Sequence, residues 1–412
     1  MGARILQWAP RVTTGSLWAL LLLLPFSKAA IEITFPIFLV SWLLAHWRTR
    51  WASSVWRTPG GRWCAITLAA YLAACELSIL TSTHLDLSVR GFICKTLEYA
   101  LLFVLAADAV QAPGVAARGV RLILLSAALV CGDAITQELI GRELVYGRRP
   151  WLIYHRMTGP YENPIDLATY LVVVVPIVVI QLSHATRRSR WWLWALLAVV
   201  MVGVVRAGSR DAWLSLAVGL GVLTMMDRRL RWMAIGLGVA LVAGASLYLQ
   251  SVGRFWAAVS FHDIGTRERW FMWQSAWHMI QDRPWLGQGL NTFMANYLSY
   301  WVGGERQPRY AHNCFLQATA ETGVIGLVTF VGFLVAMMWS WWRALRRVES
   351  EAPERRLILA LGAGMVGFLF QSAFDTNLYS LRQATLFWTL AGMATGLSLK
   401  ALPERSSFPR AS

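Results

Sequence analysis

The chain has 412 residues, of which 57% are hydrophobic and 15% are charged, and its mean hydropathy is +0.48. A soluble surface needs about 25% charged residues, so this composition excludes a pair of soluble domains. The formal net charge is +16. In a soluble chain such a charge would suggest nucleic-acid binding, but here basic cytoplasmic loops and anionic lipid head groups account for it, and we expect no nucleic-acid partner.

Apolar segments of membrane-spanning length recur along the whole chain and predict an all-α polytopic membrane protein with about 12 transmembrane helices. The N-terminal run imitates a secretion signal, but a second apolar run follows at once, so we expect it to be retained as the first helix. The predicted membrane helices are 13–26, 31–47, 63–81, 91–111, 119–140, 165–183, 191–206, 210–226, 232–250, 314–342, 357–374 and 379–398.

Four regions follow from these segments. Residues 1–250 are expected to contain the first nine membrane helices, and residues 314–400 the last three. The segment 251–313 between them is too polar to cross a bilayer and predicts one long, partly helical loop. Residues 401–412 form a short basic tail. An even number of helices places both termini on one side of the membrane.

Arginines predict which side that is. The short loops on the side of the termini are basic, whereas most short loops on the other side carry few charges, so the positive-inside rule places both termini in the cytoplasm. The long loop 251–313 then faces the periplasm. Loops 141–164 and 251–313 carry arginines against this rule, which suggests that the arginines there have a function. The alternative is that they are ordinary surface charges, because the rule is weak in long loops.

The long loop contains a predicted amphipathic helix over residues 266–280. Trp270, Trp273, Trp277 and Ile280 have helical spacing and would lie against the bilayer or the helix bundle. The sequence Asp-Arg-Pro at 282–284 is expected to end this helix, and Gly-Gln-Gly at 287–289 predicts a turn.

His312 is the main candidate for chemistry, because it stands just before the membrane helix that begins near residue 314. A histidine at a helix boundary is usually structural, but here it lies among arginines, on the predicted outer face, at a helix N-terminus that favours anions. A neutral imidazole can accept a proton from a hydroxyl group. Asn313 is either a helix N-cap or a substrate-binding residue.

The arginines at helix boundaries are the second set of candidates. Arg210 follows Gly-Ser at the start of a predicted helix, and Arg156 precedes the helix that starts at residue 165. Several arginines from separate segments could bind one diphosphate bidentately. The alternatives are snorkelling to the interface or an ion pair with Asp211 for Arg210, and a solvated loop charge for Arg156.

Several of these stretches resemble the bacterial O-antigen ligase family, which includes related polymerases and protein O-oligosaccharyltransferases. The resemblance covers residues 156–326. Its motifs are His312-Asn313, nine residues, then Gly323-x-x-Gly326; Arg269-x-x-x-Trp273; Asp282-x-Pro284-x-x-Gly287-x-Gly289; Gly208-Ser-Arg210; and the segment Arg156-x-x-Gly-x-x-x-Asn-Pro.

The resemblance implies a multi-pass glycosyltransferase of the bacterial inner membrane whose active site faces the periplasm. Such an enzyme transfers O-antigen glycan from undecaprenyl diphosphate to lipid A–core, without a nucleotide, metal or other cofactor, and we expect it to invert the anomeric centre. His312 would be the general base. Arg269 and Arg210 would bind the diphosphate, with Arg156, Arg267 and Arg309 as weaker members and Asn313 near the substrate.

The sequence does not choose the acceptor. A polymerase that joins lipid-linked glycans, or an oligosaccharyltransferase that acts on protein, would use the same chemistry. A membrane transporter is an alternative from a different class, and it would require a polar path through the whole membrane. The paired broken helices of transporters are not evident in this sequence.

Overall fold

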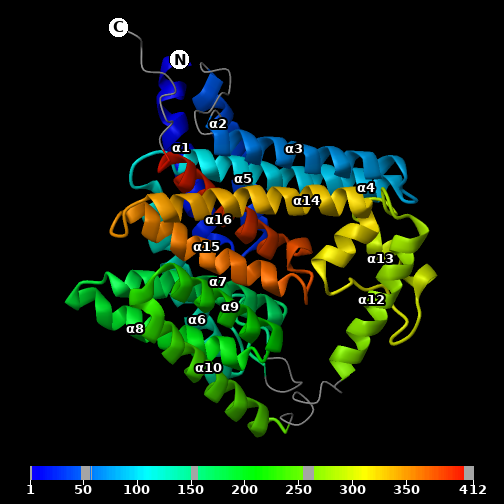
Figure 1. Cartoon of the computed structure of the whole chain (residues 1–412). Helices are drawn as coiled ribbons and strands as arrows, with labels where there is room; N and C mark the ends of the chain where they lie inside the picture. The colour runs from blue at the N-terminus through cyan, green and yellow to red at the C-terminus, as the bar shows by residue number, and fades with distance from the viewer. Residues whose placement is uncertain (1, 48–55, 57, 150–155, 254–263, 403–412) are drawn as a thin grey trace.

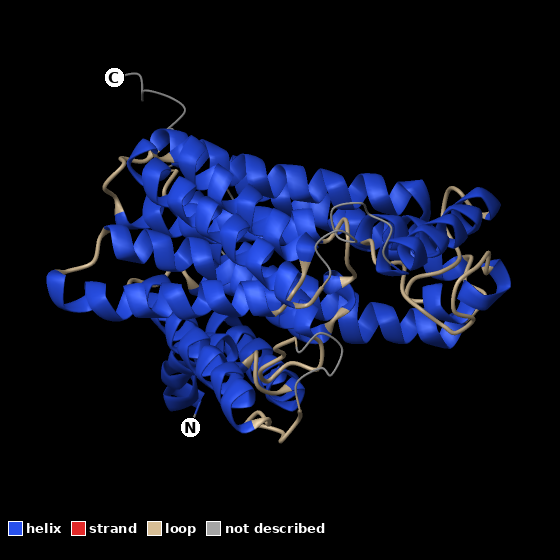
Figure 2. Ribbon diagram, turned by 90° about the horizontal axis from the view of Figure 1, so that it is seen from below, coloured by secondary structure: helices blue, strands red, loops and turns tan. Residues whose placement is uncertain are grey.

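The computed structural model describes residues 2–47, 56, 58–149, 156–253 and 264–402. Within these ranges the regular structure is entirely helical, as Figure 2 shows. Arg254 and the tail arginines Arg405 and Arg410 lie outside the described residues. The helices are α1 (Gly2–Leu23), α2 (Lys28–His46), α3 (Pro59–Leu80), α4 (Leu85–Gly91), η3 (Phe92–Leu97), α5 (Glu98–Ala109), α6 (Val115–Ile140), α7 (Pro164–Ser183), α8 (Arg187–Arg206), α9 (Arg210–Met226), η5 (Arg228–Leu230), α10 (Arg231–Ser251), α12 (Ile264–Asp282), α13 (Phe293–Asn296), η6 (Tyr297–Tyr300), α14 (Cys314–Arg347), α15 (Pro353–Gln371), η7 (Asn377–Tyr379) and α16 (Leu381–Lys400).

Each of the twelve predicted segments coincides with a helix, but the membrane crossings are only partly established. Seven helical spans among the described residues are long and apolar enough to cross a membrane. They are α2, α3, α6, α7, α8, the η5–α10 segment and α14. The protein is therefore a multi-pass membrane protein, whereas the count of twelve crossings and the placement of each loop stay predictions.

The predicted helix 91–111 differs most from the structure. It is divided into α4, the π-helix η3 over Phe92–Leu97, and α5, which ends at Ala109. The chain therefore remains helical but changes its winding near Lys95. Apolar patterning does not predict such a segment, because a π-turn changes the hydrogen-bond register and leaves the hydropathy unaltered.

Close approach of helices through glycine positions builds the centre of the bundle. α16 packs along α5, with Gly392 and Gly396 against the carbonyl groups of Phe103 and Ala107. A side chain at either glycine would overlap those carbonyls, so the four-residue spacing of small residues permits this contact. Figure 1 shows α3 and α14 side by side, with α12 and α13 gathered at one end of them.

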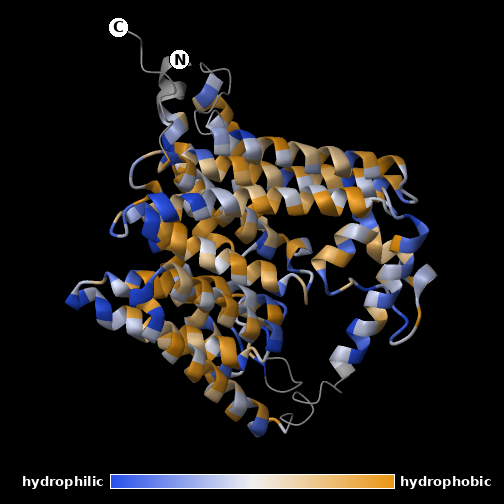
Figure 3. Ribbon diagram, in the orientation of Figure 1, coloured by the Kyte–Doolittle hydropathy of each residue, from blue (hydrophilic) through white to orange (hydrophobic). Residues whose placement is uncertain are grey.

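The distribution of polar residues fits a membrane bundle. In Figure 3 the long helices are mainly hydrophobic along their length, and hydrophilic residues gather toward the helix ends and on α12. Many large apolar side chains on the outside are exposed, among them Ile33, Val239 and Val328. Lipid tails would cover such side chains, which explains why the surface is more apolar than that of a soluble protein.

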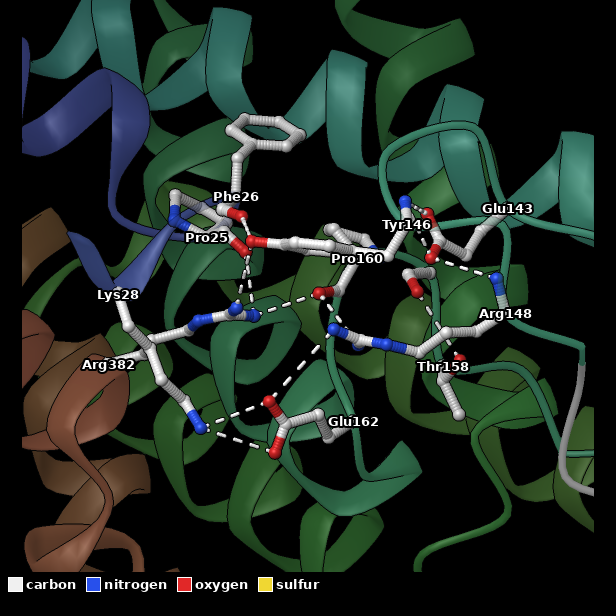
Figure 4. A network of polar contacts seen from close by, with 11 residues as sticks. Pro25, Phe26, Lys28, Glu143, Tyr146, Arg148, Thr158, Pro160, Glu162 and Arg382 are labelled. Atoms are coloured by element: carbon white, nitrogen blue, oxygen red, sulfur yellow. Dashed lines mark hydrogen bonds and ion pairs between the residues drawn. The ribbon is translucent and has the colours of Figure 1, made fainter. Parts of the chain in front are cut away.

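A polar network ties the start of α16 to two loops (Figure 4). The buried guanidinium of Arg382 donates to the carbonyl groups of Pro25 at 3.1 Å and Pro160 at 2.8 Å. Lys28 pairs with Glu162 at 3.0 Å, and Arg148 approaches the same carboxylate at 3.9 Å. Arg148, one of the arginines of the loop 141–164, therefore has a structural role.

Candidate active site

The N-terminus of α14 is capped by the residue next to His312. The Oδ1 atom of Asn313 accepts hydrogen bonds from the backbone N–H groups of Phe315 and Leu316, both at 3.0 Å. This geometry confirms the N-cap interpretation of Asn313, and its contact with substrate stays a prediction. His312 adopts a positive φ of 47°, which few residues other than glycine adopt.

The imidazole of His312 is paired with a carboxylate. Its Nδ1 atom lies 3.1 Å from Oδ1 of Asp375, in the turn between α15 and α16. The Asp375 side chain is 9% exposed, whereas the His312 side chain remains 33% exposed. A carboxylate that accepts the Nδ1–H group leaves Nε2 as the proton acceptor and stabilises the imidazolium that forms. The pair therefore has the arrangement of a general base and its orienting acid.

A buried cluster fixes the turn that carries Asp375. The backbone N–H of Cys314 donates to the Ser372 carbonyl at 2.7 Å. The Cys314 thiol donates to the Asp375 carbonyl at 3.2 Å and to Oδ1 of Asn377 at 3.3 Å. The Ser372 hydroxyl donates to the same Asn377 oxygen at 2.8 Å. These contacts hold the α15–α16 turn against the first turn of α14, and hence Asp375 beside His312.

The predicted glycine motifs explain how α12 is joined to α14. α14 is interrupted at Gly323, where φ is 68° and ψ is −176°, a conformation essentially restricted to glycine. A side chain there would overlap the Trp285 carbonyl. The N–H of Val324 donates to the Pro284 carbonyl at 2.8 Å, and the N–H of Gly289 donates to the Glu321 carbonyl at 3.0 Å. The loop after α12 thus fits into the break in α14.

The first residue of that loop motif has a local role. The Asp282 carboxylate accepts a hydrogen bond from the Tyr300 hydroxyl at 2.5 Å and one from the Gln288 amide at 3.2 Å. The Tyr300 hydrogen bond, followed by that of Gln288, lowers the pKa of Asp282 below its ordinary value. The charged carboxylate therefore tethers the loop to η6.

α12 itself runs over Ile264–Asp282, so the helix predicted for 266–280 is present and ends where expected. Its buried side is formed by Met272, Ala276 and Met279, with Ile280. Trp270 and Trp277 are 58% and 54% exposed. Within the predicted apolar stripe Ile280 packs inward and the two tryptophans are exposed, so contact of the stripe with the bilayer stays a prediction.

Arg269 and Arg210 meet where α12 approaches the start of α9. The Arg269 guanidinium binds Asp211 bidentately, with Nη2–Oδ2 at 2.6 Å and Nη1–Oδ1 at 3.2 Å. Arg210 donates from Nη2 to the Thr266 hydroxyl at 3.4 Å. Asp211 thus pairs with Arg269 and not with its neighbour, contrary to the sequence alternative of an Arg210–Asp211 pair. These contacts join α9 to α12 and bring Arg210 and Arg269, two predicted diphosphate-binding residues, together.

Arg156 joins the same region from a third segment. Its Nε donates to the Ala207 carbonyl at 2.7 Å, in the turn between α8 and α9. The neighbouring N–H of Met157 donates to the Arg206 carbonyl at 3.3 Å. Gly208 in this turn has a φ of 63° and lies against the Tyr248 ring, so the glycine preceding Arg210 is required by space and by conformation.

The two remaining predicted arginines, Arg309 and Arg267, differ in their contacts. Arg309 binds Glu268 at 3.3 Å and also pairs with Glu305, which attaches the segment before His312 to α12. Arg267 is exposed on α12 and forms no hydrogen bond or ion pair within the described part of the chain. Arg309 is therefore a link between α12 and the His312 loop, and a substrate role for either arginine stays a prediction.

The predicted residues thus form two groups and not one. Arg156, Arg210 and Arg269 gather around the α8–α9 turn, whereas His312 pairs with Asp375 at the start of α14. No direct contact joins His312 to these three arginines among the described residues; the connection runs through Arg309 and α12. Within the same residues no group of three or more His, Cys, Asp or Glu side chains is arranged to hold a metal ion.

Asp375 was missed by the sequence prediction. Its only signal was its position as an acidic residue near the end of an apolar segment, which it shares with several other acids. No pattern in the sequence indicates that Asp375 contacts His312, which lies 63 residues earlier.

Comparison with known proteins confirms the predicted resemblance. Residues 197–331 match the family model described as O-antigen ligase, and this part of the chain carries Arg210, Arg269 and His312. The chain is also similar to the exopolysaccharide production protein ExoQ of Rhizobium meliloti (strain 1021). The two are 26% identical over 180 residues, which cover 40% of this chain and 38% of that relative.

Proposed function

We propose that the protein transfers a glycan from undecaprenyl diphosphate to a sugar hydroxyl of lipid A–core, at the periplasmic face of the bacterial inner membrane. The observation that carries this proposal is the pairing of a buried Asp375 carboxylate with a partly exposed His312 imidazole, 3.1 Å apart. The family match to the region that contains His312 supports a glycan-transferring reaction.

In the proposed reaction Nε2 of His312 removes the proton of the acceptor hydroxyl, and the oxygen attacks the anomeric carbon of the donor sugar. The bond between this carbon and the diphosphate oxygen breaks, and the electron pair leaves with undecaprenyl diphosphate. One displacement inverts the anomeric centre. Asp375 stabilises the imidazolium until the proton is lost to solvent.

The arginine group is proposed to bind the departing diphosphate. Charge develops on the diphosphate oxygens as the bond breaks, and guanidinium groups that are already oriented stabilise it without a change of their own position. The bidentate contact of Asp211 holds Arg269 in one orientation, and the turn around Gly208 holds Arg210. With this charge stabilised, the diphosphate leaves without being protonated, so we expect no metal requirement.

A polymerase that adds glycan to another lipid-linked glycan is the second candidate. The match to an exopolysaccharide production protein favours it, because an exopolysaccharide differs from lipid A–core as a product. Both reactions use the same base and the same diphosphate site, so only the acceptor differs.

Reconstitution distinguishes these candidates. Purified full-length protein in liposomes is incubated with undecaprenyl diphosphate-linked glycan and either lipid A–core or a second lipid-linked glycan, without nucleotide. Product on lipid A–core supports the ligase, and elongation of the lipid-linked glycan alone supports the polymerase. Absence of both products would contradict the proposed function.

A further inference from the structure

A second polar site lies inside the bundle, next to the loop that carries His312. It is a cavity of about 60 Å³ between η3, the first turns of α14 and the η7 turn. Lys95, Tyr99, Asn291, Glu321 and Tyr379 contribute its polar lining. None of these five residues belongs to the proposed transfer site, so the cavity requires its own explanation.

Residues on both sides of His312 in the sequence contact the cavity or its lining. Cys314, two residues after His312, lines it directly. On the other side, the Tyr379 ring packs against that of Tyr310, two residues before His312, with ring centroids 6.2 Å apart. A group held in the cavity therefore lies directly behind the His312 loop.

Two unusual backbone conformations meet at Lys95 and Asn291. Lys95 belongs to the π-helical segment η3, and π-turns occur frequently at functional sites. Asn291 has a positive φ of 60°, which is uncommon outside glycine. The Lys95 ammonium group donates to the Asn291 side-chain oxygen at 2.9 Å. Two backbone conformations that cost free energy thus place an ammonium group and an amide at this cavity.

Tyr99 supplies an independent observation that points to a ligand. Its side chain is buried, at 5% exposure, and lines the cavity. Its hydroxyl has no hydrogen-bond partner among the described residues. Buried hydroxyl groups are nearly always hydrogen-bonded, because an unpaired one is costly. A ligand hydroxyl in the cavity would provide the missing partner.

The chemistry of the lining identifies the class of ligand. Its single lysine already donates to the Asn291 side chain, so the lining holds no cluster of cations that would select an anion such as a diphosphate. The tyrosines with Trp388 and Phe330 add aromatic surface. At about 60 Å³ the cavity is too small for a whole sugar ring but accepts a hydroxyl or hydroxymethyl group at its edge.

We infer that this cavity binds the edge of the acceptor sugar and so presents the acceptor hydroxyl to His312. This inference rests on the proposed function and deepens it, since it separates an acceptor site beside η3 from the arginine group for the donor. It assigns Lys95 and Tyr99 as acceptor-binding residues.

Direct binding tests this assignment without depending on turnover. Full-length protein in nanodiscs is titrated with lipid A–core, and in a second arm with an oligosaccharide repeat of the glycan. Tyr99→Phe removes only the unpartnered hydroxyl and is expected to weaken binding of one of these probes about three- to tenfold, as the loss of one hydrogen bond does. Lys95→Met is expected to weaken it further.

Matched variants separate a site from general packing. Tyr161→Phe also removes a buried hydroxyl without a partner among the described residues, but outside this cavity. Lys400→Met removes a lysine that binds the Gln111 carbonyl. Both are expected to leave probe binding unchanged. Equal affinity of Tyr99→Phe and the wild type for both probes, or no binding of either probe by the wild type, would overturn the inference. Normal binding without glycan transfer would instead contradict the proposed function.

Discussion

The imidazole of His312 and the carboxylate of Asp375 lie 3.1 Å apart, although 63 residues separate them. The contact joins the start of α14 to the turn between α15 and α16, and the hydrogen bonds of Cys314 fix both sides of it. This relationship orients the imidazole for the base role that we propose for His312. The proposed orienting partner, Asp375, lies outside the family-matched region 197–331.

Replacement of Asp375 tests the orienting role. Asp375→Asn keeps the size of the side chain but removes the charge that stabilises the imidazolium. We expect kcat for glycan transfer to fall, by less than the roughly 10²- to 10⁴-fold attributed to a general base itself. Asp86→Asn, at an exposed position in the first turn of α4, serves as the control in the same liposome assay. Unchanged kcat in Asp375→Asn would remove the aspartate from the mechanism.

Arg269→Lys tests bidentate binding of the diphosphate. Lysine keeps the positive charge but cannot reproduce the planar contact with Asp211 or with phosphate oxygens. The KM for the lipid-linked donor is expected to rise by about tenfold, with little change in the KM for the acceptor. Arg90→Lys, an exposed arginine on α4, should behave like the wild type. Full activity of Arg269→Lys would argue against this arginine as a donor ligand.

The break in α14 gives a prediction about stability. Gly323→Ala forces alanine into a conformation that costs on the order of 1–3 kcal/mol and creates an overlap with the Trp285 carbonyl. Gly332→Ala in the same helix meets open space and should stabilise by about 0.5–1 kcal/mol. Thermal unfolding in detergent compares the two variants. A Gly323→Ala protein as stable as the wild type would show that the break is dispensable.

The pair Lys28–Glu162 predicts a pH dependence of stability. The hydrogen bond from Lys28 lowers the pKa of Glu162 below its ordinary value of 4.5. The contribution of the pair is therefore present above that ordinary value and is lost as pH falls through the lower, folded-state pKa. This contribution to the free energy of unfolding is small, because both side chains are more than half exposed. Glu162→Gln should melt at a lower temperature than the wild type at neutral pH, with the difference vanishing at the acid end. A difference independent of pH would exclude the charge as its cause.

The sequence predicted the helices well because hydropathy records burial in lipid directly. The twelve apolar segments and the helix at 266–280 follow from local composition, whereas the turn predicted at 287–289 lies at 284–286. The interruption at Gly323 was not predicted, because it lies within a long apolar run and depends on the Trp285 carbonyl beside it. The residue Gly323 was recognised as part of a motif, but only the structure explains why glycine is required there.

The candidate site was less predictable, because its contacts join distant segments. Arg210 and Arg269 were expected to lie together and do, through Asp211 and Thr266. An ion pair of Asp211 with its neighbour Arg210 was one alternative, but Asp211 binds Arg269 from α12. The partnership of His312 with Asp375 depends on how α15 and α16 return to the start of α14, which no local pattern encodes.

Glycan transfer by the purified protein in liposomes, with and without the His312 imidazole, tests the proposed base most directly. We expect product from the wild type with lipid-linked glycan and an acceptor, and a loss of about 10²-fold or more in His312→Ala. The variant must show the same yield and thermal stability as the wild type, with His278→Ala, exposed on α12, as the matched control. Transfer by a folded His312→Ala protein at the wild-type rate would show that His312 is not the base.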